Sequence, residues 1–538
     1  MAAGFLDQVV MDLRRQHGDR LEDLCVVLPS RRAVVFFREA LARIYGKTLW
    51  APQIMSIQDA IRQQSGWQFP EPLRLNFELY QVYLQEMQAV NPGWYEPFEK
   101  FYPWGEMLIR DFDEVDKYCV DTSKLFSNIK DLREIELQFE LPPEDLEALQ
   151  QFWSSIRVIQ QDDSIQQETS SEVQQAFLRI WAILGPVYEA FRTSLKDRFM
   201  GYDGMAYRHL VEQLESGGFI LPFRQLIFVG FNALSVAEER IIAHLLKKEQ
   251  AVVYWDAAKA FFPELFPGET THWGLKALGE ESGRFVREFH LKWQHLSSRL
   301  ILQELSDHPK TIHLTGLPSQ VSQAHHLSEL LQGRSIQPKE LRQYAIVLGD
   351  EDLLFPVLYA LPDAISRLNI TMGFPLRQTV IYQLIYALCQ LIRKSAEIPP
   401  GEERLFPYQE ILALLDNPYL QQMAPQKAMA VRRAIVQRNL LLVPEQFLEH
   451  QQFPALVAQF FTPPSRESEL LTYIQELFDQ LLKEAEEKGY TLEAEYLFHL
   501  FTQFNQLADM LVVYNTHLSI KGFADIFLEV LKKSRIPF

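Results

Sequence analysis

Three parts of the chain combine a short apolar run with a longer stretch of helical periodicity. The runs are CVVLPSRRAVVFF at residues 25–37, QLIFVGFNALSVAEERII at 225–242 and YAIVLGDEDLLFPVL at 344–358. Apolar, β-branched runs followed by amphipathic helices are typical of parallel strands joined by crossover helices. Open sheets of this kind bind their ligands where the strands end. The pattern therefore predicts an α/β fold and directs attention to the residues after each run.

Two long blocks have apolar residues at three- and four-residue spacing, which predicts helices. They cover residues 73–204 and 405–538. We expect residues 1–72 and 205–308 to form one α/β domain into which the first block is inserted. Residues 309–404 would begin a second α/β domain, which the second block interrupts. The expected architecture is α/β with large helical insertions, and helices dominate it overall.

Charge and composition narrow the function classes only a little. The 538 residues carry 70 acidic and 52 basic side chains, a formal net charge of −18. This excess disfavours a simple basic nucleic-acid coat protein. A local basic groove is still compatible with it, because salt screens each charge beyond about 10 Å. The same excess suits docking onto a basic partner.

The cysteines and the apolar segments predict a cytoplasmic protein. Cys25, Cys119 and Cys389 lie far apart without C-x-x-C spacing, so we expect reduced, buried thiols. No apolar stretch approaches the roughly 20 residues that a membrane helix needs. The N-terminal residues 1–19 mix acids and bases with apolar positions and lack the regions of a secretory signal.

The chemistry of a nucleotide-hydrolysing enzyme is missing from the predicted strand ends. A phosphate-binding loop reads G-x-x-x-x-G-K-[ST], but the Gly-Lys-Thr at residues 46–48 has Leu41 where the first glycine belongs. After the second run, Gly230, Phe231 and Asn232 stand where such ATPases carry a metal-binding acid. We therefore predict no catalytic residue, no cofactor and no metal site in this chain.

Other candidates favour ordinary structural roles. Asp350 and Glu351 follow the third run and could serve an ATPase, but a helix N-cap and first-turn acids explain them better. His325 and His326 are adjacent, so their side chains diverge by about 100° on a helix, and no ligand set accompanies them. Aromatic residues between 94 and 104 could stack on bases, yet their helical spacing favours a core.

The segment LPSRR at residues 28–32 offers binding chemistry at a strand end. Ser30 can cap the helix that follows. The first N–H groups of that helix, together with Arg31 and Arg32, suit contact with a phosphate. A capped surface helix with solvated arginines explains the same residues equally well, so both interpretations stay open.

Several segments, occurring in this order, are similar to one family. They are VVLPSRRAVVFFREAL, LWAPQIMSIQDAI, FYPWGEMLIRDFDEVDKY, GYDGMAYR, VGFNALSVAEE, VYWDA, YAIVLGDEDLLFPVLYALP and LNITMGFPL. The chain resembles the inactivated superfamily 1 helicase and PD-(D/E)xK nuclease proteins of Bacteroidetes type, relatives of the B subunit of the AddAB helicase–nuclease. The resemblance spans essentially the whole chain. It implies two RecA-like domains and a role in processing double-strand DNA ends for recombinational repair.

The resemblance also implies site residues and partners. Residues 28–32 match a helicase segment that contacts the backbone of single-stranded DNA. The DNA-binding candidates are Ser30, Arg31, Arg32, Asn232, Arg208 and Thr371. The protein partner would be a helicase–nuclease subunit similar to AddA. Family members run longer, so we expect a fragment that ends inside the second helical insertion, without the C-terminal exonuclease of its relatives.

Two functions of different classes follow from these observations. The leading hypothesis is a DNA-binding scaffold that holds single-stranded DNA without hydrolysing ATP. The rival is an interaction subunit that docks the active helicase–nuclease and touches DNA little, which the acidic excess favours.

Overall fold

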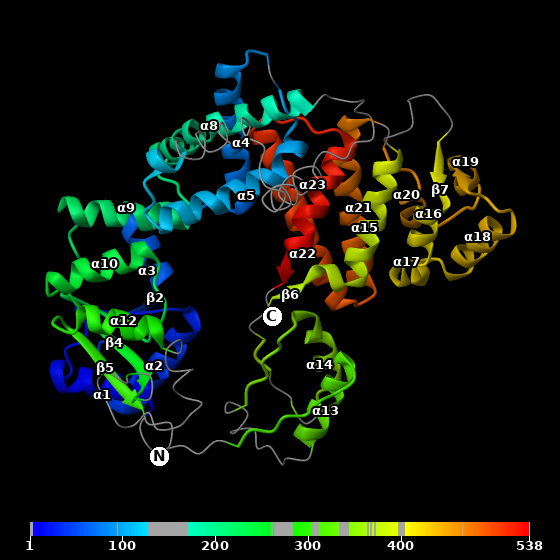
Figure 1. The fold of residues 1–538 in the computed structure, drawn as a ribbon. Helices are drawn as coiled ribbons and strands as arrows, with labels where there is room; N and C mark the ends of the chain where they lie inside the picture. The colour runs from blue at the N-terminus through cyan, green and yellow to red at the C-terminus, as the bar shows by residue number, and fades with distance from the viewer. Residues whose placement is uncertain are drawn as a thin grey trace.

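The computed structural model shows a helix-dominated protein with a five-stranded parallel sheet (Figure 1). The described residues are 4–93, 95–126, 170–259, 262, 283–303, 311–332, 344–362, 365, 368–370, 373–395, 404–464 and 466–536. Within these ranges, no helix combines the length and the apolar character that crossing a bilayer requires.

The five-stranded sheet confirms the predicted α/β class. Its strands are β1 (Leu24–Leu28), β2 (Gln53–Ser56), β3 (Gln225–Val229), β4 (Ala251–Ala258) and β5 (Ser298–Gln303). They lie in the order β2-β1-β3-β4-β5, and every neighbouring pair is parallel. All five strands therefore end along the same edge of the sheet, which we call the carboxyl edge.

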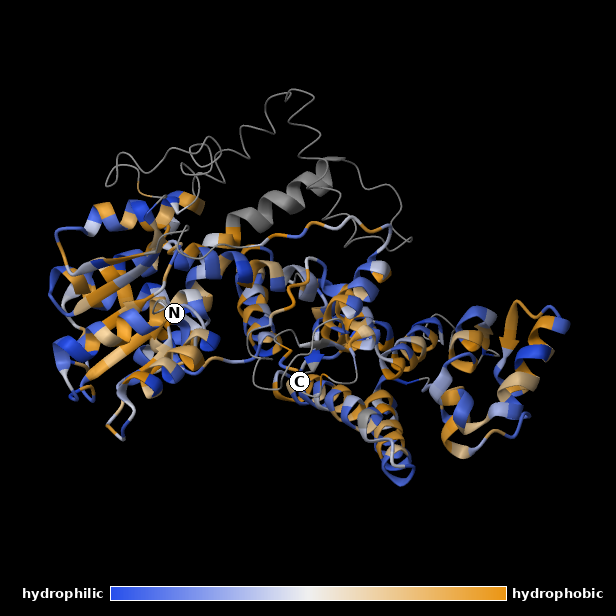
Figure 2. Ribbon diagram, turned by 90° about the horizontal axis from the view of Figure 1, so that it is seen from below, coloured by the Kyte–Doolittle hydropathy of each residue, from blue (hydrophilic) through white to orange (hydrophobic). Residues whose placement is uncertain are grey.

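Helices cover both faces of this sheet. On one face lie α1 (Phe5–His17) and α2 (Arg31–Tyr45), and on the other α3 (Ile57–Ser65), α9 (Asp203–Ser216), α10 (Val236–Lys247) and α12 (Arg284–Trp293). Val26 and Leu28 of β1 join the first core, whereas Cys25 and Val27 join the second. Because β1 is buried on both faces, it reads as an unbroken apolar run. Figure 2 shows the same hydrophobic character along the strands.

One hydrophobic core joins the two helical blocks that the sequence predicts separately. Its helices are α4 (Pro72–Val90), α5 (Phe98–Lys117), α8 (Ser170–Asp197), α15 (Val380–Ser395), α21 (Glu467–Glu487), α22 (Thr491–Val513) and α23 (Ile520–Lys533). The C-terminal α23 packs against both α5 and α15, and α22 packs against α4 (Figure 1). The apolar faces of the two blocks are thus buried against each other.

A smaller module lies at one end of this helical body. It contains β7 (Leu405–Pro407), α16 (Tyr408–Leu415), α17 (Pro418–Met423), α18 (Pro425–Gln437), β8 (Leu442–Pro444), α19 (Glu445–Glu449) and α20 (Ala455–Gln459). β7 and β8 form an antiparallel pair. The sequence predicts only helices here, because three-residue strands are too short to show an alternating pattern.

The third apolar run does not form its predicted strand. Residues 344–348 have no regular secondary structure and pair with no described segment, and Val347 is 89% exposed. Residues 311–316 likewise have no regular secondary structure and pair with no described strand, with Leu314 93% exposed. A run of high strand propensity becomes a strand only when a neighbour supplies the hydrogen-bonding partners. The described residues therefore contain one parallel sheet, and the two expected RecA-like domains are not confirmed.

The remaining elements lie between residues 320 and 378, apart from the last strand, β9. They are α13 (Gln320–Gln332), the 3₁₀ turn η4 (Glu351–Leu353), α14 (Leu354–Ala360), β6 (Phe374–Pro375), the 3₁₀ turn η5 (Leu376–Gln378) and β9 (Arg535–Ile536). β6 and β9 pair antiparallel, so residues near the end of the chain contact the segment that leads into α15.

β5 is a strand that the sequence pattern misses. The spacing predicts helices as far as residue 308, whereas residues 298–303 pair with β4. Ser298, Arg299 and Gln303 leave only a short apolar stretch in SRLILQ. The pairing with β4, rather than the local pattern, makes this segment a strand.

Candidate nucleic-acid interface

The carboxyl edge contains a topological switch between β1 and β3. After β1 the chain crosses to β2 on one side, and it later returns to β3 on the other side. Loops that leave a sheet in opposite directions open a crevice for a ligand. The loop after β1 carries Ser30 and the loop after β3 carries Asn232. The two candidates therefore follow the ends of neighbouring strands. Neighbouring strands in a sheet lie about 4.8 Å apart.

The loop after β1 leads into a capped helix N-terminus. Ser30 is extended, and its Oγ accepts a hydrogen bond from the N–H of Ala33 at 3.2 Å. This confirms Ser30 as the N-cap of α2. The first turn of a helix has N–H groups without helical partners and a partial positive charge. Because Arg31 and Arg32 are both exposed there, the end of α2 suits an anion.

Arg31 is already paired with an acid at this edge. Its Nη2 lies 2.6 Å from Oδ1 of Asp59 and its Nε donates to Oδ2 at 3.1 Å. The hydrogen bond from Arg31 holds the pKa of Asp59 below its ordinary value. The Arg31 side chain is 75% exposed, so this pair contributes less than about 1 kcal/mol. A phosphate could therefore compete with Asp59 for the guanidinium.

Arg32 carries the unpaired positive charge of this loop. No carboxylate of a described residue lies within ion-pair distance of it, and its guanidinium lies 5.9 Å from the ring centroid of Phe36. Phe36 and its neighbour Val35 are about half exposed. An exposed cation beside an exposed aromatic ring is the combination that single-stranded nucleic acids contact through phosphate and base.

The loop after β3 is a tight turn without a carboxylate. Gly230 has φ +73°, in the left-handed region that favours glycine, and its N–H donates to the carbonyl of Tyr254 at 3.0 Å. Phe231 turns inward and is 5% exposed, whereas Asn232 is exposed. The turn thus presents an amide at the position where a hydrolysing enzyme would need an acid.

Two further candidates do not join this edge. Arg208 lies in a buried network, with its Nε 2.7 Å from Oδ1 of Asp116. Its Nη2 donates to the carbonyls of Val115 and Val120 at 2.9 and 2.7 Å. These internal partners give Arg208 a structural role, so we leave it out of the interface. Thr371 lies outside the described residues.

Two motifs have the structural roles that the sequence favours. Gly46 ends α2 with φ +60°, and Lys47 forms a 2.5 Å ion pair with Asp19 at the opposite edge from Ser30. The Gly-Lys-Thr sequence is therefore no phosphate loop. Asp350 caps η4, since its side chain accepts a hydrogen bond from the N–H of Asp352 at 3.0 Å.

The aromatic cluster near residue 100 belongs mostly to the core. Phe98, Phe101 and Tyr102 are at most 3% exposed, as the helical spacing predicts. Tyr95 is 60% exposed, and Trp94 lies outside the described residues. The buried rings are unable to stack on bases.

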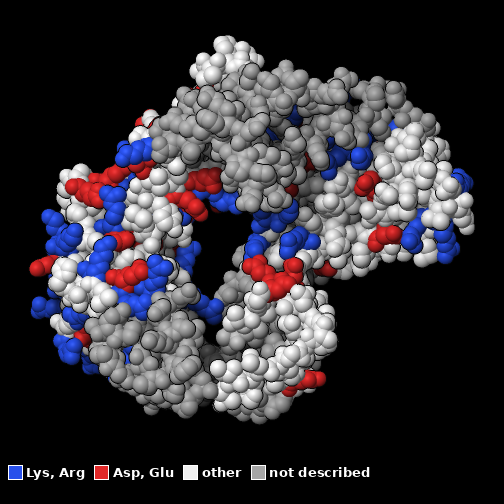
Figure 3. Space-filling view, in the orientation of Figure 1, with Lys and Arg blue, Asp and Glu red and all other residues white. Residues whose placement is uncertain are grey.

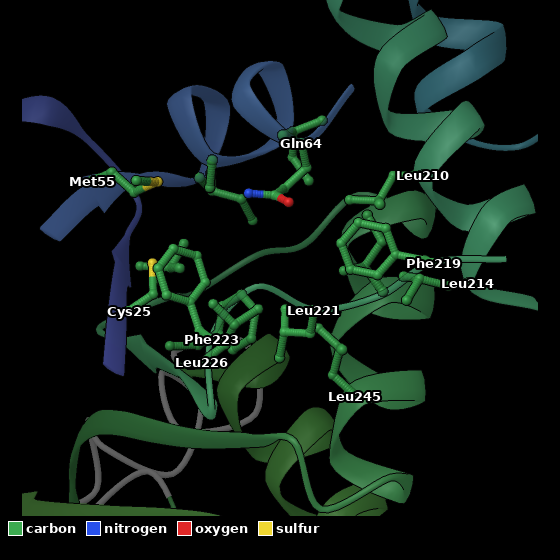
Figure 4. A pocket seen from close by; sticks show the side chains of 16 residues that line it. Cys25, Met55, Gln64, Leu210, Leu214, Phe219, Leu221, Phe223, Leu226 and Leu245 are labelled. Carbon is green, nitrogen blue, oxygen red and sulfur yellow. The ribbon is translucent and has the colours of Figure 1, made fainter. Parts of the chain in front are cut away.

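An apolar cavity of about 40 Å³ lies between the sheet and the helices α3, α9 and α10 (Figure 4). Leucine, isoleucine and phenylalanine side chains form most of its wall, and Gln64 is a polar exception. Cys25 also lines the cavity, and burial raises the pKa of its thiol to about 12. A thiol that stays protonated is a poor nucleophile. The cavity is therefore part of the core, with no group suited to catalysis.

Neither a search for metal ligands nor a comparison with known proteins narrows the candidate functions further. The described part of the chain contains no group of three or more His, Cys, Asp or Glu side chains that could hold a metal ion. Neither a scan against protein-family models nor a search of curated proteins finds a match.

Sequence reasoning missed Asp59, the acid that pairs with Arg31. A signal was present, because Ser56 and Asp59 form an S-x-x-D capping pattern directly after the extended residues 49–55. In the structure Ser56 Oγ donates to Asp59 at 2.6 Å, and it accepts from the N–H of Asp59 at 3.2 Å. The pairing of Asp59 with an arginine 28 positions earlier depends on the parallel register of β1 and β2.

Proposed function

We propose that this protein is a helicase-like scaffold that binds single-stranded DNA without hydrolysing ATP. The observation that carries the proposal is the carboxyl edge between β1 and β3. A capped helix N-terminus with the exposed Arg32 follows β1, and the exposed amide of Asn232 follows the neighbouring strand β3. Phosphates bind to helix N-termini and arginines, and these contacts carry no base specificity.

The absence of nucleotide chemistry supports the non-hydrolysing part of the proposal. The segment after β1 reads LPSRR and contains no glycine, so its backbone is unsuited to wrapping a triphosphate. The turn after β3 holds Gly230, Phe231 and Asn232, none of which can ligate magnesium as a carboxylate does. An architecture that binds DNA at this edge would therefore act as a support for a partner that supplies the motor.

The biological setting of the proposal comes from the family resemblance. Residues 1–72 with 205–308 would be a first RecA-like domain, and residues 309–404 the start of a second. The protein would act in recombinational repair, within a complex that processes double-strand DNA ends. Its partner would be a helicase–nuclease similar to AddA, and its site of action the cytoplasm.

Fluorescence anisotropy with fluorescein-labelled dT20 tests the DNA-binding part. The wild type should bind, with log affinity falling by about 0.7 per phosphate neutralised for each decade of salt. We expect Arg32→Ala to weaken binding roughly threefold to tenfold and Arg31→Ala/Arg32→Ala to weaken it further, because each arginine removed deletes a phosphate contact. The salt slope should fall in parallel.

The matched control is Lys47→Ala, which removes a cation from the opposite edge of the same sheet. Its affinity for dT20 should equal that of the wild type. Equal affinities of the two arginine variants and the wild type would remove these arginines from the site. Heat released on titration with ATP and magnesium would contradict the non-hydrolysing scaffold.

A second candidate function is a protein-interaction subunit, which the net charge of −18 favours. It would dock the helicase–nuclease partner and contact DNA little. Stable co-purification with such a partner, combined with no measurable binding of dT20 by this chain, would select it over the scaffold.

A further inference from the structure

The small module beyond the helical body places three helices around a two-stranded sheet. α16, α17 and α18 follow one another directly between β7 and β8. Asn417 caps α17, since its Oδ1 accepts from the N–H of Tyr419 at 3.0 Å, and its Nδ2 donates to the carbonyl of Val380 at 3.1 Å. Pro418 and Pro425 open the second and third helices. α18 in turn packs against both α16 and α17.

α18 has an inner and an outer face. Ala428, Val431 and Ile435 are buried against the module. Since each residue advances by about 100° around a helix, the side directly opposite carries residues 426, 430, 433 and 437. These are Gln426, Ala430, Arg433 and Gln437, and all four are exposed. The outer face therefore presents two glutamine amides and one arginine guanidinium, with an alanine between them.

The charge of α18 is opposite in sign to that of the whole chain. Its 13 residues include Lys427, Arg432 and Arg433 and no acid, and Arg438 follows at its C-cap. Arg432 pairs with Asp416 at 3.1 Å, whereas Arg433 forms no ion pair with a described residue and has Nη2 3.5 Å from the sulfur of Met429. Figure 3 shows Lys and Arg side chains gathered over α18 at the edge of the molecule.

We propose that α18 binds duplex DNA through its outer face, which enters the major groove. The inference rests on the proposed function in requiring DNA as the partner, but it uses a surface separate from the carboxyl edge. Glutamine and arginine side chains recognise adenine and guanine edges in that groove, and flanking cations contact the phosphates. In homeodomains, a three-helix variant of the helix-turn-helix fold, the third helix likewise packs on two others and contacts the major groove with its outer side.

The composition of the outer face favours DNA over a protein partner. The stripe opposite the buried side is polar, whereas an amphipathic helix that docks into a protein groove presents apolar anchors there. The exposed apolar residues Met429 and Val436 lie on one flank of the stripe, where they could contact thymine methyl groups. The scaffold would then hold the duplex at α18 and the single strand at the carboxyl edge.

Anisotropy titrations of the full chain with a fluorescein-labelled 20-base-pair duplex and with dT20 test this inference. We expect Arg433→Ala to weaken duplex binding roughly tenfold, because it removes one groove contact and one cation. Ala430→Glu places a carboxylate at the centre of the outer face and should abolish duplex binding. Binding of dT20 should stay unchanged in both variants, and Arg32→Ala should show the reverse selectivity.

The matched control is Lys483→Ala on α21, which removes an exposed cation from another helix. Its duplex affinity should equal that of the wild type. Wild-type affinity of Arg433→Ala and Ala430→Glu for the duplex would overturn the inference, and would leave α18 as a surface for an acidic protein. Equal loss of duplex and dT20 binding in these variants would also overturn it. The effect of Arg32→Ala on dT20 binding tests only the carboxyl edge. Single-strand binding at that edge and duplex binding at α18 can therefore be contradicted independently.

Discussion

Arg31 and Arg32 are neighbours in sequence, yet the fold gives their charges different surroundings. Arg31 donates two hydrogen bonds to the carboxylate of Asp59, whereas Arg32 lies beside the ring of Phe36. Since Asp59 neutralises one of the two cations at the end of α2, it should weaken the attraction of this edge for phosphate. The acid therefore acts as an internal competitor for any anion that binds here.

Asp59→Asn tests this competition. Removing the carboxylate releases the guanidinium of Arg31, so we expect affinity for dT20 to rise roughly threefold, in line with about one additional phosphate contact. The cap of α3 is kept, because Ser56 Oγ still accepts from the backbone N–H of residue 59 and an amide oxygen can still accept from Ser56. Anisotropy titrations at two salt concentrations should show a steeper salt slope in the variant.

The control for this experiment is Asp19→Asn, which removes an exposed acid from the opposite edge of the sheet. It changes the net charge equally and should leave dT20 affinity unaltered. A gain of the same size in both variants would mean that overall charge, rather than the release of Arg31, controls binding.

At the level of elements, the close packing of α9 on α5 depends on one glycine. A Cβ at Gly204 would overlap the backbone carbonyl of Asp113, and the N–H of Gly204 donates to the carboxylate of Asp113 at 2.6 Å. α9 also carries the Arg208 that pairs with buried Asp116. The contact between these helices thus anchors the first helical block to the sheet domain.

Gly204→Ala should separate α9 from α5 and lower the free energy of unfolding by about 2–3 kcal/mol, the cost typical of overpacking against backbone. Urea unfolding followed by circular dichroism measures the change. Gly218→Ala, just beyond the end of α9 and with no atom closer than 3.7 Å to the added Cβ, should change stability by less than about 0.5 kcal/mol. Similar destabilisation by both substitutions would contradict the role given to the close approach of Gly204 to Asp113.

At the scale of the whole molecule, segments more than 400 positions apart share one core. Glu78 of α4 is 3% exposed, accepts from the guanidinium of Arg198, and accepts from the hydroxyl of Tyr514 beyond α22. Phe77 stacks on the same Tyr514 ring at a centroid distance of 5.3 Å. The first helical block and the C-terminal block should therefore unfold together.

Glu78→Gln tests this coupling. It leaves the partly buried Arg198 without its carboxylate, so the free energy of unfolding should fall by about 2–3 kcal/mol, somewhat below the cost of breaking a fully buried pair. Hydrogen exchange should report faster exchange in α22 as well as in α4. The exposed Glu487→Gln should alter neither. Faster exchange confined to α4 would show that the two blocks unfold independently.

The local pattern of the sequence determined most of the helices, the strands β1 and β3 of the sheet, the Ser30 cap and the absence of a phosphate loop. These features depend on side-chain periodicity and on neighbours within one turn, which are written in consecutive residues. β5 could not be predicted from the pattern, because the polar Ser298 and Arg299 interrupt its apolar residues. The apolar run at 344–348 did not indicate whether another strand would pair with it.

Only the tertiary structure decided which of the candidate residues meet. It buried Arg208 beside Asp116, paired Arg31 with Asp59, and brought Ser30 and Asn232 to adjacent strand ends. It also joined two helical blocks in one core and turned a face of α18 outward. Such contacts link positions tens to hundreds of residues apart, and their geometry depends on strand order and helix packing, which no local pattern specifies.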